Sequence, residues 1–155
     1  MKVFVLALLT GFTLRAQHDV TPAVRDRIEK AVLEVNAQMT AASEALDIDR
    51  LFSYMLPNER GSIVLNGVLY ATREDALAAV KANARGGASV RYFWKSLMVT
   101  VLSPTNALLV SLGEAVVRPD RDPDHPVTTP FSQSILFVLS EGKWRALHAH
   151  QSAQR

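Results

Sequence analysis

Two histidines near the C-terminus are the residues whose type and spacing most directly suggest chemistry. His148 and His150 alternate along a β-prone stretch, so their imidazoles are predicted to share one face of a strand. An imidazole titrates near neutral pH and can transfer a proton or contact a ligand. Structural hydrogen bonding is the alternative role for both. Glu114 could complete a three-ligand zinc site, but Lys95 beside it would repel a cation, and we predict no metal.

Lys95 and Glu114 are themselves predicted to pair across neighbouring strands. The pair is either screened by solvent or partly desolvated, and in the second case Glu114 becomes a base or an anchor for a ligand. Tyr54 lies on a predicted short helix. Its side chain either packs in the core or covers the pocket with its hydroxyl pointing inward. The predicted ligand-binding residues are Tyr54, Lys95, Gln133, Trp144 and His150, and the predicted catalytic residues, for an enzyme, are Glu114 and His148.

Other patterns that resemble functional motifs do not fit them. Asp120, Asp122 and Asp124 are spaced like a calcium loop, but His125 replaces the glycine of its sharp turn and Phe131 replaces its bidentate glutamate. The sequence contains no phosphate-binding glycine loop, nucleophile elbow or C-x-x-C pair. We therefore predict no cofactor.

Helices are predicted to dominate the first half of the chain. Thr21-Pro22 is a typical helix start, and apolar residues recur at helical spacing from there to Met39. Asn66-Gly67 is a hairpin turn, and Thr72 with Asp75 forms a capping box. The predicted elements are helices over 22–39, 49–55 and 72–85 and a hairpin over 62–70.

Four long strands are predicted over residues 89–102, 106–118, 129–140 and 143–151. Tight turns join the first two and the last two strands, and the charged, proline-rich stretch 119–128 forms a longer loop. Helices followed by an antiparallel meander indicate an α+β fold in which the helices cover one face of a curved sheet.

Tight turns fix strand register, and register predicts which side chains converge. The predicted opposite residues are Leu102 and Ala107, Lys95 and Glu114, Leu139 and Trp144, Phe137 and Ala146, Ile135 and His148, and Gln133 and His150. Across the longer loop, Glu114 is paired with Gln133. One face of the sheet then carries apolar rows and ends in a polar row of Lys95, Glu114, Gln133 and His150. Such a face predicts a pocket with an apolar floor and a polar mouth.

The element order and the closing segment EGKWRALHAHQS resemble the nuclear transport factor 2-like superfamily. Trp144, His148, His150 and Ser152 resemble the end of SnoaL-like domains of unknown function, and are similar to the association domain of calcium/calmodulin-dependent protein kinase II. The resemblance spans residues 22–153. It implies a cystatin-like cone, with three N-terminal helices packed on a curved, mainly antiparallel sheet, and a homodimer through the outer sheet face around Tyr92, Trp94 and Met98.

The resemblance implies no single activity, because the superfamily includes isomerases, cyclases, dehydratases and non-catalytic modules. Ketosteroid isomerases place a catalytic aspartate in the hairpin region, whereas residues 62–66 here contain no acid. The kinase association domain lines its pocket with arginines, and Glu114 and Ile135 stand at two of those positions.

The N-terminus is predicted to be an export signal. Lys2 precedes an apolar run that ends at Leu14, which matches a secretory signal over residues 1–16 and is too short for a typical membrane span. A buried strand or a retained anchor is the alternative. We expect residues 17–155 to form a single secreted or periplasmic domain with no membrane association. Without Lys2 and Arg15, the basic residues equal the acidic ones in number, which disfavours a nucleic-acid partner.

These patterns together predict an exported domain that binds a small apolar or carbonyl-bearing molecule. The first alternative is a small enzyme of isomerase, cyclase or dehydratase type, in which Glu114 or His148 moves a proton. The second alternative is a dimeric assembly module.

Overall fold

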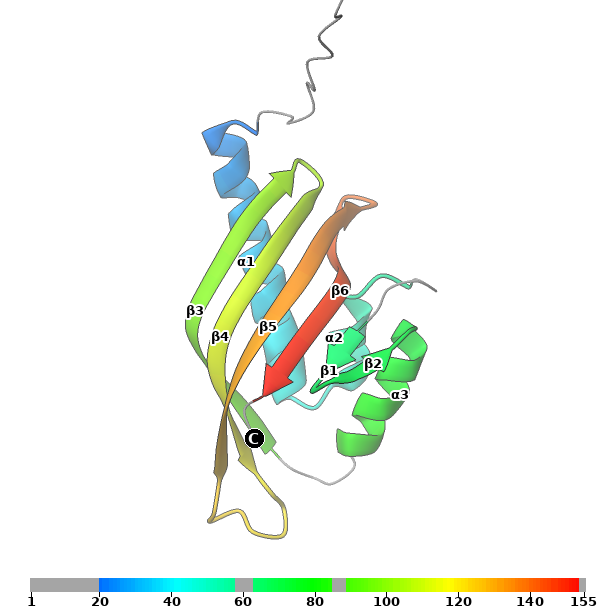
Figure 1. Cartoon of the computed structure of the whole chain (residues 1–155), viewed down its shortest axis with the longest axis vertical. Helices are drawn as coiled ribbons and strands as arrows, with labels where there is room; N and C mark the ends of the chain where they lie inside the picture. The colour runs from blue at the N-terminus through cyan, green and yellow to red at the C-terminus, as the bar shows by residue number, and fades with distance from the viewer. Residues whose placement is uncertain (1–19, 58–62, 85–88, 154–155) are drawn as a thin grey trace, which may run out of the picture.

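The computed structural model describes residues 20–57, 63–84 and 89–153 (Figure 1). The predicted export signal and the predicted end of the third helix, at residue 85, lie outside the described residues. The elements in chain order are α1 (Pro22–Glu44), α2 (Ile48–Ser53), β1 (Ile63–Leu65), β2 (Val68–Tyr70), α3 (Arg73–Ala84), β3 (Ser89–Ser103), β4 (Asn106–Arg118), β5 (Val127–Ser140) and β6 (Lys143–Ala153). No helix in the described part is long and apolar enough to cross a membrane.

The helices begin where short polar side chains satisfy free backbone N–H groups. Thr21 Oγ1 accepts from the N–H of Val24 at 3.4 Å, and Pro22 follows it at the first helical position. Thr72 Oγ1 accepts from the N–H of Asp75 at 3.1 Å and donates to the Asp75 carboxylate at 2.7 Å, which confirms the predicted capping box. Helix α1 extends past Met39, the last residue of the predicted apolar periodicity, because no helix breaker intervenes before Leu46, which has a positive φ of 56°.

The strands form one six-stranded sheet in the order β2-β1-β6-β5-β4-β3. All neighbouring strands run antiparallel except β1 and β6, which pair in parallel. The predicted hairpin is confirmed, and its pairing with β6 brings it to the edge of the long strands (Figure 1). The protein therefore has an α+β fold with a mostly antiparallel sheet.

A single buried cluster joins helix α1 to the sheet. Ile28, Val32 and Met39 from α1 belong to the same core as Leu109 and Phe137, and Val32, Leu109 and Phe137 are fully buried. Burial of such side chains contributes about 1.5–3 kcal/mol each relative to exposure. One face of the sheet is thus covered, and the other carries the exposed side chains of Phe93, Met98 and Leu112.

The register near the β5–β6 turn is confirmed, but a bulge changes it further along. Leu139 pairs with Trp144 and Phe137 with Ala146, as predicted. Leu147 is then an extra residue in β6, so that His148 pairs with Leu136 and His150 pairs with Ser134. The predicted partners Ile135 and Gln133 are therefore wrong for the two histidines. One unpaired residue reverses the face on which all later side chains of a strand point.

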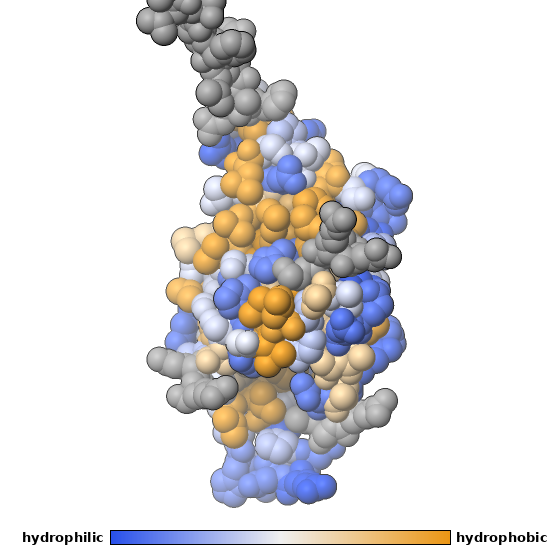
Figure 2. All heavy atoms as spheres, turned by 45° about the vertical axis from the view of Figure 1, so that its right-hand side comes forward, coloured by the Kyte–Doolittle hydropathy of each residue, from blue (hydrophilic) through white to orange (hydrophobic). Residues whose placement is uncertain are grey.

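The predicted β3–β4 register is wrong for the same reason. Leu102 and Lys95 are extra residues in β3, so that Val101 pairs with Ala107 and Phe93 pairs with Glu114. The predicted pairing of Glu114 with Gln133 is also wrong. Strand β5 begins at Val127, earlier than predicted, and the shorter loop pairs Glu114 with Pro130 instead. This loop is hydrophilic and forms the blue lower end of the molecule in Figure 2.

Candidate functional site

The covered face of the sheet contains a cavity of about 180 Å³. Its walls come from α1, α2, the hairpin, α3 and the strands β3, β5 and β6. The apolar part of the lining consists of Met39, Leu51, Phe52, Met55, Ile63, Leu65, Val80, Ile135 and Ala149. The cavity thus lies inside the core that attaches the helices to the sheet.

A polar row crosses the sheet at this cavity. Ser111, Gln133 and Gln151 pair in register on three consecutive strands, so their side chains project on the same face. Gln133 and Gln151 line the cavity. Ser111 is fully buried, and its hydroxyl has no hydrogen-bond partner among the described residues. The predicted row of Lys95, Glu114, Gln133 and His150 is therefore wrong except for Gln133.

Helix α1 contributes the most deeply buried polar side chain of the cavity wall. Asn36 is 3% exposed, lies one turn after Val32 on the core face of the helix, and lines the cavity. Its backbone oxygen accepts from Thr40 Oγ1 at 2.9 Å, whereas its side-chain amide has no hydrogen bond to another described residue. An amide at the cavity wall can both donate to and accept from a ligand, so this position is suited to a ligand that completes its hydrogen bonds.

Three aromatic rings pack together beside the cavity, and two of them, Tyr92 and Trp94, line it. The ring of Trp94 lies 6.0 Å from that of Tyr92 in a stacked arrangement, and Phe131 meets both rings edge-on at 5.6 and 5.3 Å. The Tyr92 hydroxyl lies 3.2 Å from Ser43 Oγ, and the Tyr92 N–H donates to the Glu44 carboxylate at 2.8 Å. These contacts fix strand β3 against the end of α1.

The placement predicted for Tyr92 and Trp94 on the outer face is wrong, because both line the cavity. The bulge at Lys95 separates them from Met98, which pairs with Val110 on the outer face as predicted. The alternation of residues along β3 therefore changes its face between Trp94 and Met98.

Four of the predicted site residues project from the outer face of the sheet instead. Lys95 Nζ contacts the Glu114 carboxylate at 2.6 Å, so the predicted ion pair is confirmed, with side chains 62% and 32% exposed. Glu114 neighbours Gly113, whose Cα faces the Phe131 ring on the cavity side, and therefore points the opposite way. His148 and His150 follow their partners Leu136 and Ser134 to the outer face. Their functional roles stay predictions.

The remaining two predicted residues meet in a different depression. Tyr54 and Trp144 line a shallow cleft between α1, α2 and the start of β6, together with Arg50 and Arg145. A hydrogen bond to the Tyr54 side chain raises the pKa of Arg50 above its ordinary value. The structure thus distributes the predicted site over three places: the cavity, this cleft and the outer face.

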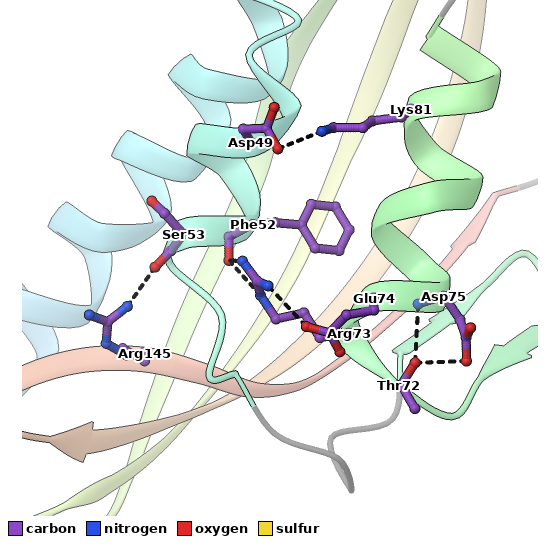
Figure 3. A network of polar contacts seen from close by, with 9 residues as sticks. All are labelled: Asp49, Phe52, Ser53, Thr72, Arg73, Glu74, Asp75, Lys81 and Arg145. Carbon is purple, nitrogen blue, oxygen red and sulfur yellow. Dashed lines mark hydrogen bonds and ion pairs between the residues drawn. The ribbon is translucent and has the colours of Figure 1, made fainter.

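Helix α3 and the end of α2 are joined by contacts that position the cavity wall (Figure 3). Arg73 donates from Nε and Nη2 to the carbonyl oxygen of Phe52, at 3.0 and 2.9 Å. Lys81 Nζ contacts the Asp49 carboxylate at 2.6 Å. Figure 3 shows the Phe52 ring between α2 and α3, and this ring lines the cavity.

Sequence reasoning missed Asn36, Trp94 and Gln151 as site residues. Asn36 could have been found, because it interrupts the apolar face of a strongly periodic helix between Val32 and Met39. Gln151 and Trp94 could not, because their orientation depends on bulges that no turn residue announces. Among the described residues, no cluster of three metal-ligating side chains occurs.

Comparisons with known proteins agree with this fold. The sequence model of the SnoaL-like domain matches residues 32–155, whereas no curated protein matches the chain. A proposed dehydratase of the NTF2-like family from Streptomyces avermitilis is 18% identical, with a TM-score of 0.73 over 84% of this chain and 99% of that one.

Two further solved structures match the cystatin-like fold and the kinase association domain that the resemblance named. An uncharacterized protein with a cystatin-like fold from Caulobacter vibrioides is 18% identical, with a TM-score of 0.67 over 81% of this chain and 89% of that one. A proposed calcium/calmodulin dependent protein kinase II association domain from Xanthomonas campestris is 14% identical, with a TM-score of 0.63 over 83% of this chain and 86% of that one. The predicted resemblance to the nuclear transport factor 2-like superfamily is confirmed, and these likenesses show the fold.

Proposed function

The chain belongs to the SnoaL-like domain family, and from its cavity we propose that it binds a small, uncharged molecule with an apolar ring and a carbonyl or hydroxyl group. The observation that carries the proposal is a cavity whose polar lining is neutral. Asn36, Gln133 and Gln151 supply amides, and Tyr92 supplies a hydroxyl. Each amide both donates and accepts hydrogen bonds.

The described lining carries no charged side chain and therefore disfavours ionic ligands. No Asp, Glu, Lys, Arg or His side chain lines the cavity among the described residues. Transfer of an unpaired charge from water into such surroundings is strongly unfavourable. A carbonyl or hydroxyl group, in contrast, finds partners in the amides of Asn36 and Gln133.

The volume of the cavity sets the size of the ligand. An apolar protein cavity of about 150 Å³ holds benzene, and drug-sized ligands occupy pockets of about 300–1,000 Å³. A volume of about 180 Å³ therefore suits a single ring with one small substituent.

Binding is favoured over proton-transfer catalysis by the same lining. General acid–base catalysis requires an ionisable group within hydrogen-bond reach of the substrate, and Tyr92 is the only such group among the described lining residues. Glu114 and His148 lie on the opposite face of the sheet. The likeness to the proposed dehydratase supports an enzyme of that type as the alternative.

Binding can be tested with cyclohexanone, a neutral ring with one carbonyl group. The chain has two tryptophans, and Trp94 lines the cavity while Trp144 lines the cleft, so the indole N–H signals in a ¹⁵N NMR spectrum report the two places separately. We expect cyclohexanone to shift the Trp94 signal. Gln133→Leu removes one hydrogen bond, of about 1 kcal/mol, and should weaken binding about fivefold.

The matched control is Gln38→Leu, which makes the same exchange at an exposed position of α1 outside the cavity. Its affinity should equal that of the unaltered protein. Cyclohexanecarboxylate, a charged analogue, should leave the Trp94 signal unchanged. Equal shifts by both compounds, or equal effects of both variants, would contradict the proposed neutral site.

We also propose a homodimer through the outer sheet face. Its support is the exposure of three large apolar side chains on that face: Phe93 at 55%, Met98 at 54% and Leu112 at 47%. Apolar patches of this kind commonly mark interfaces. Met98→Glu should reduce the sedimentation mass to that of a monomer, and a monomeric unaltered protein would contradict the dimer.

Export is proposed on the sequence of residues 1–16 alone. The support is Lys2 followed by an apolar run, which is typical of a secretory signal. Cell fractionation should recover a processed chain outside the cytoplasm, and N-terminal sequencing should place its start near Gln17. An unprocessed chain recovered from the cytoplasm would contradict export.

A further inference from the structure

The shallow cleft between α1, α2 and β6 differs from the cavity in charge. It has a volume of about 440 Å³ and is lined by three cationic side chains, Arg50, Lys143 and Arg145. No carboxylate lines it among the described residues. Tyr54 and Trp144 add two aromatic side chains. A cleft lined by one sign of charge raises the local concentration of oppositely charged molecules.

The three cations are not neutralised within the described part of the protein. None of them lies within ion-pair distance of a described carboxylate. Asp47 caps α2 by accepting from the backbone N–H of Arg50 at 3.1 Å, and its charge acts on the Arg50 guanidinium without an ion-pair contact. The positive charge of the cleft is therefore not cancelled by an ion pair within the described structure.

Two of the cationic groups are held in place by the rim of the cleft. The Arg50 guanidinium interacts with the Tyr54 side chain, one helical turn away, and this interaction raises the pKa of Arg50. Arg145 Nη1 donates to the carbonyl oxygen of Ser53 at 2.5 Å (Figure 3). A guanidinium has five N–H donors in a planar fork that matches carboxylate and phosphate oxygens. Both groups keep donors that these contacts do not use.

From this arrangement we propose that the cleft is a second ligand site, which binds a small organic anion consisting of a carboxylate or phosphate group on a flat ring. The anionic oxygens accept hydrogen bonds from Arg50, Lys143 and Arg145. The ring packs against the aromatic side chains of Tyr54 and Trp144. The site is independent of the cavity, because the two share no lining residue.

Phenyl phosphate and benzoate are the probes, titrated into ¹⁵N-labelled full-length protein. We expect both to shift the Trp144 indole signal and to leave the Trp94 signal unchanged. Inorganic phosphate should bind more weakly than phenyl phosphate, because it lacks the ring. Because the cations are largely exposed, a rise in NaCl concentration should weaken binding. A shift of Trp94 instead of Trp144, or equal affinity for phosphate with and without the ring, would overturn the site as described.

Charge-neutral variants locate the interaction. Arg50→Gln should weaken phenyl phosphate binding about tenfold, the usual effect of losing a hydrogen bond to a charged group, and Arg50→Gln with Lys143→Gln should abolish it. Both side chains are exposed, so these variants are expected to fold. Arg118→Gln is the matched control, since it removes one exposed cation at the far end of β4. An equal loss of affinity in the control, or no loss of affinity in Arg50→Gln, would contradict the site. It would show that the anion is attracted only by the overall positive charge of the protein.

Discussion

Replacement of Gly113 by alanine tests the close approach of strands β3 and β4 beside the cavity. A Cβ atom on Gly113 would lie 2.8 Å from the backbone oxygen of Phe93 and 3.3 Å from two atoms of the Phe131 ring. Real Cβ atoms essentially never approach another heavy atom closer than 3.0 Å. The backbone of β3 must therefore move, at the point where the bulge at Lys95 already distorts it.

The expected magnitude results from two opposing effects. Overpacking of a filled site costs about 1–3 kcal/mol. Alanine also restricts the unfolded chain more than glycine does, which favours folding by about 0.4–1 kcal/mol. The free energy of unfolding of Gly113→Ala should therefore fall by about 1.3 kcal/mol, the difference between the midpoints of the two ranges.

Urea unfolding measures this change as a lower midpoint at an unchanged slope. The same variant should shift the Trp94 indole signal, because Phe131 packs against Trp94 with ring centroids 5.3 Å apart. A second background identifies which clash matters. Phe131→Leu removes the ring contact but leaves the Phe93 backbone oxygen, so Gly113→Ala should stay destabilising in that background.

Two outcomes would refute the reasoning. A Gly113→Ala protein as stable as the unaltered one would show that β3 does not approach β4 this closely. A cost that disappears in the Phe131→Leu background would show that the ring, and not the backbone of β3, is the obstacle.

Three further predictions concern polar groups around the site. Arg73→Met removes both hydrogen bonds to the Phe52 carbonyl and should lower the free energy of unfolding by about 1.5–3 kcal/mol in urea titrations; an unchanged midpoint would contradict the role of this contact. Ser111→Ala removes a buried hydroxyl without a partner in the described structure, so thermal unfolding should show equal or greater stability, and a loss above about 1 kcal/mol would reveal a hidden hydrogen bond. Glu114→Gln breaks the exposed pair with Lys95 and should cost at most about 1 kcal/mol, with the difference vanishing at high salt.

Local patterns in the sequence were sufficient to predict which helices and strands form, although not where α1 ends and β5 begins. Thr21-Pro22, the capping box at Thr72 and the turn at Asn66-Gly67 each act within a few residues, and all three are confirmed. The apolar periodicity of α1 likewise identified the face that joins the core. Such signals depend only on neighbours in the chain, which a sequence displays directly.

Tertiary structure decided which side chains line the site. Lys95 and Leu147 are bulge residues, and each changes the alternation of side chains between the two parts of its strand that it separates. For this reason Trp94 and Gln151 line the cavity while His150 points away from it. A bulge is a property of the pairing between two strands, and that pairing involves residues far apart in the chain. The sequence by itself determined which elements form, and only their packing decided which of two faces each side chain occupies.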